Sequence, residues 1–172
     1  MACAVISGFS VDCRESIGGI KKLWFTNFNN VTALALTADV ITGITMTGST
    51  KFWGYEQVKE TSNYIEAIQV SPENGTLGYE TTLTAVFNKS DTSLRNQIRL
   101  LAQGALMVCI LDRNGKYWMM GQYAGVEMAN SSHTSGQAMG DRNGYELSFI
   151  SKENLPMFEV TQAAIQAVDD IA

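Results

Sequence analysis

Proline, histidine, cysteine and positive charge are all scarce in this chain of 172 residues, which has 2 Pro, 1 His, 3 Cys and 12 Lys and Arg against 17 Asp and Glu. The net charge of −5 disfavours tight nucleic-acid binding, because holding phosphate groups needs a basic surface. Cys3, Cys13 and Cys109 are irregularly spaced and form no C-x-x-C motif, so they predict no metal or redox site. We expect three reduced thiols packed as small apolar side chains. A Cys3–Cys13 disulfide that ties down an N-terminal arm is the alternative.

Motifs for catalysis, cofactors and membranes are missing as well. His133 lies among serines in a polar stretch, where adjacent residues rarely form the geometry of a nucleophile and its base. Asp112-x-Asn114 and Asp141-x-Asn143 begin like calcium loops but lack the late glutamate of that motif. No apolar run approaches the roughly 18 residues of a membrane span, and the apolar start lacks the basic residues of a secretory signal. The sequence therefore predicts a non-enzyme without catalytic residue, metal, cofactor or membrane contact.

The residues that are present favour a mainly β fold, because β-branched and aromatic side chains fill most of the apolar stretches. The predicted class is a β-sandwich or barrel in a single domain of residues 1–172, with an N-terminal arm at 1–17 and a C-terminal segment at 158–172. Val31–Met46 is expected to form two short strands or one long ribbon. The other expected strands are Lys21–Phe28, Lys51–Tyr55, Tyr64–Val70, Thr76–Phe87, Ala105–Leu111, Lys116–Tyr123, Tyr145–Ile150 and Phe158–Val160.

Two helices are predicted beside these strands. Leu94, Ile98 and Leu101 recur at helical spacing and indicate a flanking helix at Thr92–Gln103. A shorter helix is expected at Thr161–Ile171, near the C-terminus. Between them, Asn130–Gly140 is predicted to be a polar loop.

A long hairpin is predicted over residues 61–87, with its turn at Ser71–Gly75, where Pro and Asn-Gly supply turn residues. If Ser71 pairs with Thr76, strand alternation separates an apolar face from a small polar face. The apolar face is expected to pack on the core and comprises Tyr64, Ile68, Val70, Leu77, Tyr79 and Leu83. The other face carries Asn63, Gln69, Glu80, Thr82 and Thr84, with Ile65 and Ala67 as its apolar members.

Two classes of function remain open from the residues alone. A hairpin with an unpaired edge tends to pair with another chain, which favours a structural protein that assembles with copies of itself. The alternative is a small monomeric β-sandwich module that binds a partner through Asn130–Gly140. For self-assembly we expect contacts in the N-terminal arm, the 31–50 region and the C-terminal segment, since exposed apolar patches mark interfaces. The expected contact residues are Val31, Leu34, Leu36, Ile41, Ile44, Met46, Phe158, Val160, Ile165 and Val168.

Four stretches, most of them centred on turns, resemble tail tube and other tail structural proteins of phages that infect Bacteroidetes-type hosts. They are Ile17–Phe28 (IGGIKKLWFTNF), Ser71–Glu80 (SPENGTLGYE), Asp112–Gly121 (DRNGKYWMMG) and Gly140–Tyr145 (GDRNGY). The order of elements is similar too: strands, a long hairpin, one helix and further strands. Neck or ring proteins and tail terminators of phages are the alternatives within the same kind of virion.

The resemblance implies a virion structural protein without catalytic residues. Its copies would form stacked rings, usually hexameric, around a conduit for genome delivery, and the chain would be assembled in the bacterial host cytoplasm and carried in the tail of the virion. The implied partners are copies of itself, other tail or neck proteins, and double-stranded DNA that passes through without tight binding. Loops such as the 31–46 region would reach a neighbouring ring.

If the hairpin lines such a tube, its polar face points into the lumen. Hydroxyls and amides offer DNA no strong hold, and the carboxylate of Glu80 repels phosphate, whereas lysines and arginines would bind it and release counterions. The alternative is that this face is ordinary outer surface. The expected lumen residues are Asn63, Gln69, Glu80, Thr82 and Thr84.

Overall fold

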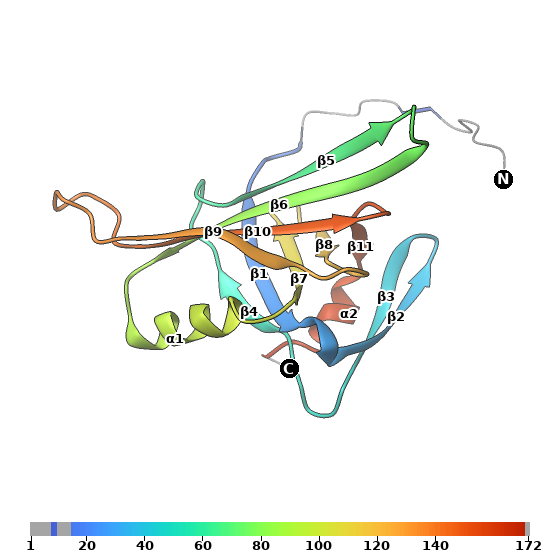
Figure 1. The fold of residues 1–172 in the computed structure, drawn as a ribbon. Helices are drawn as coiled ribbons and strands as arrows, with labels where there is room; N and C mark the ends of the chain where they lie inside the picture. The colour runs from blue at the N-terminus through green and yellow to red at the C-terminus, as the bar shows by residue number, and fades with distance from the viewer. Residues whose placement is uncertain (1–7, 10–14, 171–172) are drawn as a thin grey trace.

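The computed structural model describes residues 8–9 and 15–170, and these form two β-sheets and two α-helices (Figure 1). This confirms the predicted mainly β class, as a β-sandwich with a short C-terminal helix. Most of the predicted N-terminal arm, including Cys3 and Cys13, lies outside the described residues. In chain order the elements are β1 Ile20–Asn27, the 3-10 turn η1 Phe28–Asn30, β2 Val31–Thr37, β3 Val40–Met46, β4 Trp53–Glu56, β5 Asn63–Ser71, β6 Thr76–Asn88, α1 Thr92–Leu101, β7 Leu106–Asp112, β8 Tyr117–Met120, β9 Glu127–Thr134, β10 Gly144–Glu153, β11 Phe158–Val160 and α2 Gln162–Gln166.

The strands divide into a large sheet and a four-stranded sheet. The large sheet has seven strands in the order β2-β3-β11-β8-β7-β1-β4, and the four-stranded sheet has the order β5-β6-β10-β9. Every neighbouring pair is antiparallel except β11 and β3. The two sheets face each other across a core, and α2 packs against the far side of the large sheet (Figure 1).

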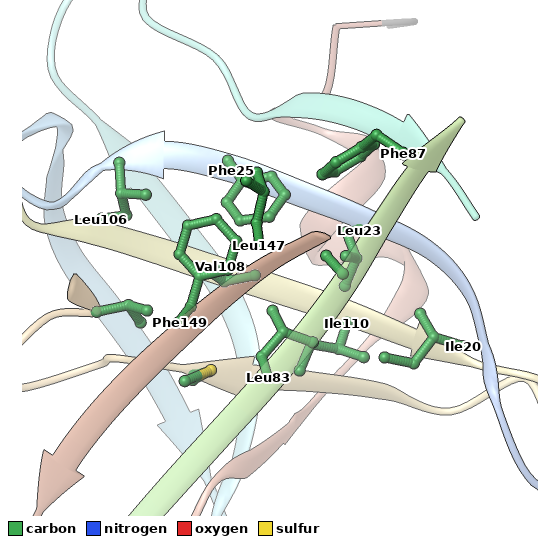
Figure 2. Close-up of a cluster of buried hydrophobic side chains, with 13 residues drawn as sticks. Ile20, Leu23, Phe25, Leu83, Phe87, Leu106, Val108, Ile110, Leu147 and Phe149 are labelled. Atoms are coloured by element: carbon green, nitrogen blue, oxygen red, sulfur yellow. The ribbon is translucent and has the colours of Figure 1, made fainter. Parts of the chain in front are cut away.

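Two apolar cores explain the continuous apolar run of β7. Leu106, Val108 and Ile110 belong to the core between the sheets, together with residues of β6 and β10 (Figure 2). Their neighbours Met107, Cys109 and Leu111 belong to a second core on the opposite face of the large sheet, beneath α2. The strand is therefore buried on both faces, as its sequence predicts. Burial also raises the pKa of the Cys109 thiol far above its ordinary value.

Several predicted boundaries change in the structure. The 31–46 region forms two strands joined by a tight turn, in which Ala38 and Asp39 both have positive φ. Helix α1 ends at Leu101, two residues early. Helix α2 covers only Gln162–Gln166. It ends early because the Val168 carbonyl accepts a hydrogen bond from the Phe52 N–H, and Asp169 forms an isolated β-bridge with Phe52.

The prediction of a polar loop at 130–140 is wrong for its first half. Residues as far as Thr134 continue β9, which pairs with β10 through a bulge near Leu147. Small polar side chains can occupy this strand because it lies at an edge, with all of Ala129–Thr134 exposed. The only exposed loop left here is residues 135–143, so the proposed binding surface of a monomeric module is smaller than expected.

The prediction of subunit contacts is wrong for four of its ten residues. Ile41, Phe158, Val160 and Ile165 are buried within the chain, in the core beneath α2. Parallel pairing of β11 with β3 brings the C-terminal segment onto the 31–46 region, so the two apolar regions cover each other. Val31, Leu34, Ile44, Met46 and Val168 pack at the margin of that core and remain partly exposed, and Leu36 is exposed. For these six, the contact role stays a prediction.

The long hairpin has the predicted register but not the predicted burial. Ser71 pairs with Thr76, and the pairing continues without a shift to Asn63 and Thr84. Leu83 is fully buried and Tyr64 packs against the same core. Ile68, Val70 and Leu77 are exposed on the same face, so the prediction that the whole face packs on the subunit core is wrong. The distal part of the hairpin projects beyond the sheet that covers its root (Figure 1).

None of the helices in the described part of the chain is both long enough and apolar enough to span a membrane.

Candidate assembly surface on the four-stranded sheet

The outward face of the four-stranded sheet collects all five residues predicted to face a lumen. Because directly paired residues share a face, the ladder fixes the rows: Asn63, Thr84 and Ser148 lie across the sheet, followed by Ile65, Thr82 and Ile150, and then Ala67, Glu80 and Lys152. Gln69 follows along β5. None of the predicted five is buried, so this face, which we call the polar face, is an exposed surface of mostly small side chains. Its charged residues are the paired Glu80 and Lys152 and, toward β9, Glu127 and Glu146. Whether it lines a channel stays a prediction.

Glu80 is not a lone carboxylate on the polar face. Its Oε2 accepts a hydrogen bond from Gln69 Nε2 at 2.9 Å and lies 3.2 Å from Lys152 Nζ. The charge of the carboxylate is thus largely balanced locally, and the expected repulsion of phosphate is weaker than the hairpin alone suggests. Sequence reasoning missed Lys152 because it belongs to β10, whose register against β6 has no local signal.

The two outer strands of this sheet are open at their edges. Within the described residues, β5 pairs only with β6, and β9 only with β10. β5 runs for nine residues without lysine, internal proline or register shift, and its one charged residue is the inward-facing Glu66, so it has few of the features by which soluble proteins protect an edge strand. The two edges can therefore accept strands from another chain.

Beyond the end of β10 the hairpin continues as a two-stranded projection. Glu153, the last residue of β10, pairs with Tyr79, so residues 69–78 have no third strand beside them. We call residues 68–79 the arm, which starts at this last row shared with β10. Ile68 and Tyr79 form one pair on the inner face of the arm, and Val70 and Leu77 form the next. The side chains of Ile68, Val70 and Leu77 are 63%, 64% and 52% exposed. A two-stranded ribbon is only marginally stable by itself in water. Exposed apolar side chains on such a ribbon therefore favour a conformation or a partner that covers them.

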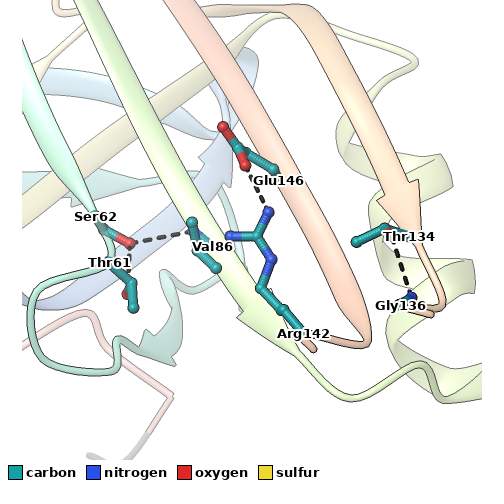
Figure 3. A network of polar contacts seen from close by, with 7 residues as sticks. All are labelled: Thr61, Ser62, Val86, Thr134, Gly136, Arg142 and Glu146. Carbon is teal, nitrogen blue, oxygen red and sulfur yellow. Dashed lines mark hydrogen bonds and ion pairs between the residues drawn. The ribbon is translucent and has the colours of Figure 1, made fainter. Parts of the chain in front are cut away.

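Polar contacts fasten the root of the hairpin to the rest of the chain. Ser62 is buried, and its Oγ donates to Gln57 Oε1 at 2.6 Å. The same Oγ accepts from the Val86 N–H at 3.1 Å (Figure 3). Farther along β5, Glu66 Oε2 accepts a hydrogen bond from the Met157 N–H at 2.8 Å. These contacts hold the root against the rest of the chain, and the arm projects from it.

Glu153 marks the boundary between the root and the arm. Its Oε1 accepts from the N–H groups of Tyr123 and Ala124 at 2.8 and 3.1 Å. Burial raises the pKa of this carboxyl above its ordinary value, the two N–H donors partly offset the rise, and the nearby charge of Glu66 adds to it. The carboxyl thus ties the 123–124 turn to the end of β10.

His133 lies on β9, is exposed, and belongs to a small polar cluster. His133 Nε2 lies 2.6 Å from Ser90 Oγ, which donates to Asn143 Oδ1 at 2.7 Å, and the imidazole packs on Tyr145. In the part of the chain that the structure describes, no carboxylate hydrogen-bonds to the ring to orient it as a base would require. Through Ser90, the cluster connects the segment before α1 to β9 and to the residue that precedes β10. These contacts support the fold.

Other chemistry is sparse on the described residues. They contain no group of three His, Cys, Asp or Glu side chains placed to hold a metal ion. An open hollow of about 440 Å³ lies between β1 and α2, and its lining mixes charged and aromatic side chains, among them Lys22, Trp24, Tyr117 and Asp169.

Comparison of this chain with known proteins found no matching family model, no matching curated protein and no matching solved structure. The resemblance to phage tail tube proteins therefore stays a prediction from the sequence.

Proposed function

We propose that this protein is a self-assembling structural subunit of a phage tail tube, in which the four-stranded sheets of neighbouring copies join into one closed sheet. The observation that carries the proposal is the pair of open edges on a sheet whose outward face is polar. The two strands at these edges run in opposite directions, because the three ladders between them are all antiparallel. When β5 of one copy lies beside β9 of the next, the new ladder is antiparallel as well.

The same arrangement favours a ring over an open fibre. The interface is heterologous, since β5 contacts β9 rather than another β5, and heterologous interfaces make rings when their rotation closes. β9, on the far side of β10, is level with the root of the hairpin, whereas β5 extends into the arm. Pairing β5 of one copy with β9 of the next therefore shifts the two copies relative to each other along the strand direction. Closed barrels require a stagger between strands of this kind, and closure removes both open edges.

The polar face would then line the conduit. Its hydroxyls and amides, with a Glu80–Lys152 pair that balances its own charge, give passing DNA few fixed positive charges to bind. Each contact between a phosphate and a cationic side chain releases counterions and strengthens DNA binding, with a slope of about −0.9 in log affinity against log salt concentration. A wall without free cations makes few such contacts and therefore lets the DNA move. The overall charge of −5 acts in the same direction.

Electron microscopy of the purified full-length chain over a range of concentrations tests the proposal. We expect hollow rings at low concentration and tubes at high concentration, with a subunit number that light scattering confirms. Binding of the particles to double-stranded DNA should be weak in a mobility-shift assay and should change little with salt concentration, because few cations contact phosphate. A chain that remains monomeric at every concentration would contradict the proposal.

A further inference from the structure

The two ends of the four-stranded sheet differ in charge and in what they expose. The arm projects at one end, and the hairpin Asn63–Asn88 that carries it contains three glutamates and no lysine or arginine. Glu80 pairs with Lys152, and Glu66 belongs to the root, where it accepts from the Met157 N–H. The arm is therefore apolar on its inner face and carries one carboxylate, Glu73, in the turn at its tip.

At the opposite end of the sheet the connection between β9 and β10 projects, and α1, which begins four residues after the last residue of β6, lies below it (Figure 1). Leu94, Ile98 and Leu101 pack one side of this helix on the core between the sheets. Its exposed side carries Arg95 and Arg99, one turn apart, and Leu100, which is 65% exposed. Among the described residues neither guanidinium has an ion-pair partner. The exposed side of α1 is therefore basic and also carries an exposed leucine.

We infer that the arm of one copy seats on α1 of a second copy stacked end to end with it. The apolar inner face of the arm (Ile68, Val70 and Leu77) would cover Leu100, and the acidic tip would approach Arg95 and Arg99. The inference rests on the self-assembly proposed above and adds to it the contact that joins one ring to the next. Every copy in a ring would present its arm at one rim and its α1 at the other, so the rims are complementary and stacking continues in one direction.

A second copy fits this surface better than the chain itself does. The described part of the chain leaves the inner face of the arm uncovered, although the ladder holds the arm in a regular register up to Ser71 and Thr76. Glu73 at the tip of the arm and the two arginines of α1 have opposite charge, which favours contact between the arm of one copy and α1 of another and opposes contact between two arms or two α1 helices. Apolar side chains flanked by charges are also the usual composition of an interface.

A matched pair of variants tests the contact. Ile65 and Ile68 lie on β5 with nearly equal exposure, 61% and 63%, but on opposite faces. We expect Ile68→Lys to lower the association constant for stacking of rings by about tenfold or more and Ile65→Lys to leave it unchanged, as measured by sedimentation and tube length in micrographs.

Arg95→Glu with Arg99→Glu should block stacking as Ile68→Lys does, and combining them with Ile68→Lys should restore it in part. Thermal unfolding of the dilute variants checks that each still folds.

The outcomes separate this inference from the proposed function. Rings that stack equally well with Ile68→Lys, or that lose stacking equally with Ile65→Lys, would overturn the arm contact and leave the ring proposal standing. Filaments without rings, broken by Ile68→Lys, would support the arm contact and contradict the closed ring. A wild-type chain that stays monomeric would overturn both.

Discussion

The root and the arm of the long hairpin follow the same sequence pattern and have opposite environments. Tyr64 and Leu83 at the root lie on the same face of the same two strands as Val70 and Leu77 in the arm. Leu83 is fully buried, whereas Leu77 is half exposed. The difference arises outside the hairpin, since β10 and the large sheet cover the root but do not extend to the arm. Alternation in a strand therefore determines which residues share a face, and elements distant in sequence determine whether that face is covered.

The largest effect expected from this comparison is on the stability of the dilute monomer. Leu83→Ala should lower the free energy of unfolding by about 2–5 kcal/mol, because it removes methyl groups from a closed core and leaves a cavity. Leu77→Ala, the same substitution in the arm, should change it by less than about 0.5 kcal/mol. Denaturant unfolding of both variants at low concentration measures the two values. Equal losses would mean that the arm is already packed in the monomer, and the comparison would fail.

Much of the fold was predictable because its signals are local. The hairpin register follows from one turn, Ser71–Gly75, and from the parity of the strands on either side. The burial of β7 on both faces follows from six successive apolar residues. The interior placement of Ile41, Phe158 and Ile165 was not predictable, because it depends on parallel pairing of β11 with β3 across more than a hundred residues. Before that pairing is known, the same apolar residues look like uncovered surface.

The polar face was predictable in part for the same reason. Its β5 and β6 residues come from one hairpin, so parity alone groups Asn63, Thr82 and Thr84. Lys152, which balances Glu80, comes from β10, and no feature near either residue indicates the pairing. The strand at 130–134 was also missed, because polar residues at a sheet edge have the composition of a loop.

A smaller effect is expected at the boundary between root and arm, where Glu153 is partly buried. Its pKa is raised in the folded state, so its contribution to stability is present below the ordinary pKa of a glutamate and is lost as the pH rises through the folded-state pKa. Glu153→Gln keeps an oxygen that accepts from Tyr123 and Ala124 but carries no charge. We expect the variant to gain stability relative to wild type between pH 4.5 and pH 7, by less than about 1 kcal/mol because solvent screens the site.

Chemical denaturation of Glu153→Gln and wild type at the two pH values checks this expectation. A difference between the two proteins that does not change with pH would show that the pKa of Glu153 is not raised in the folded state.

The central claim, that β5 of one copy pairs with β9 of the next, is tested most directly by hydrogen–deuterium exchange of assembled and dilute protein. Amides at an open edge exchange quickly, and they slow when a ladder forms across that edge. The account predicts that peptides covering β5 and β9 both gain protection on assembly, whereas β7, which is buried in the monomer, is protected in both states. Assembled particles in which β5 and β9 exchange as fast as in the dilute chain would contradict it.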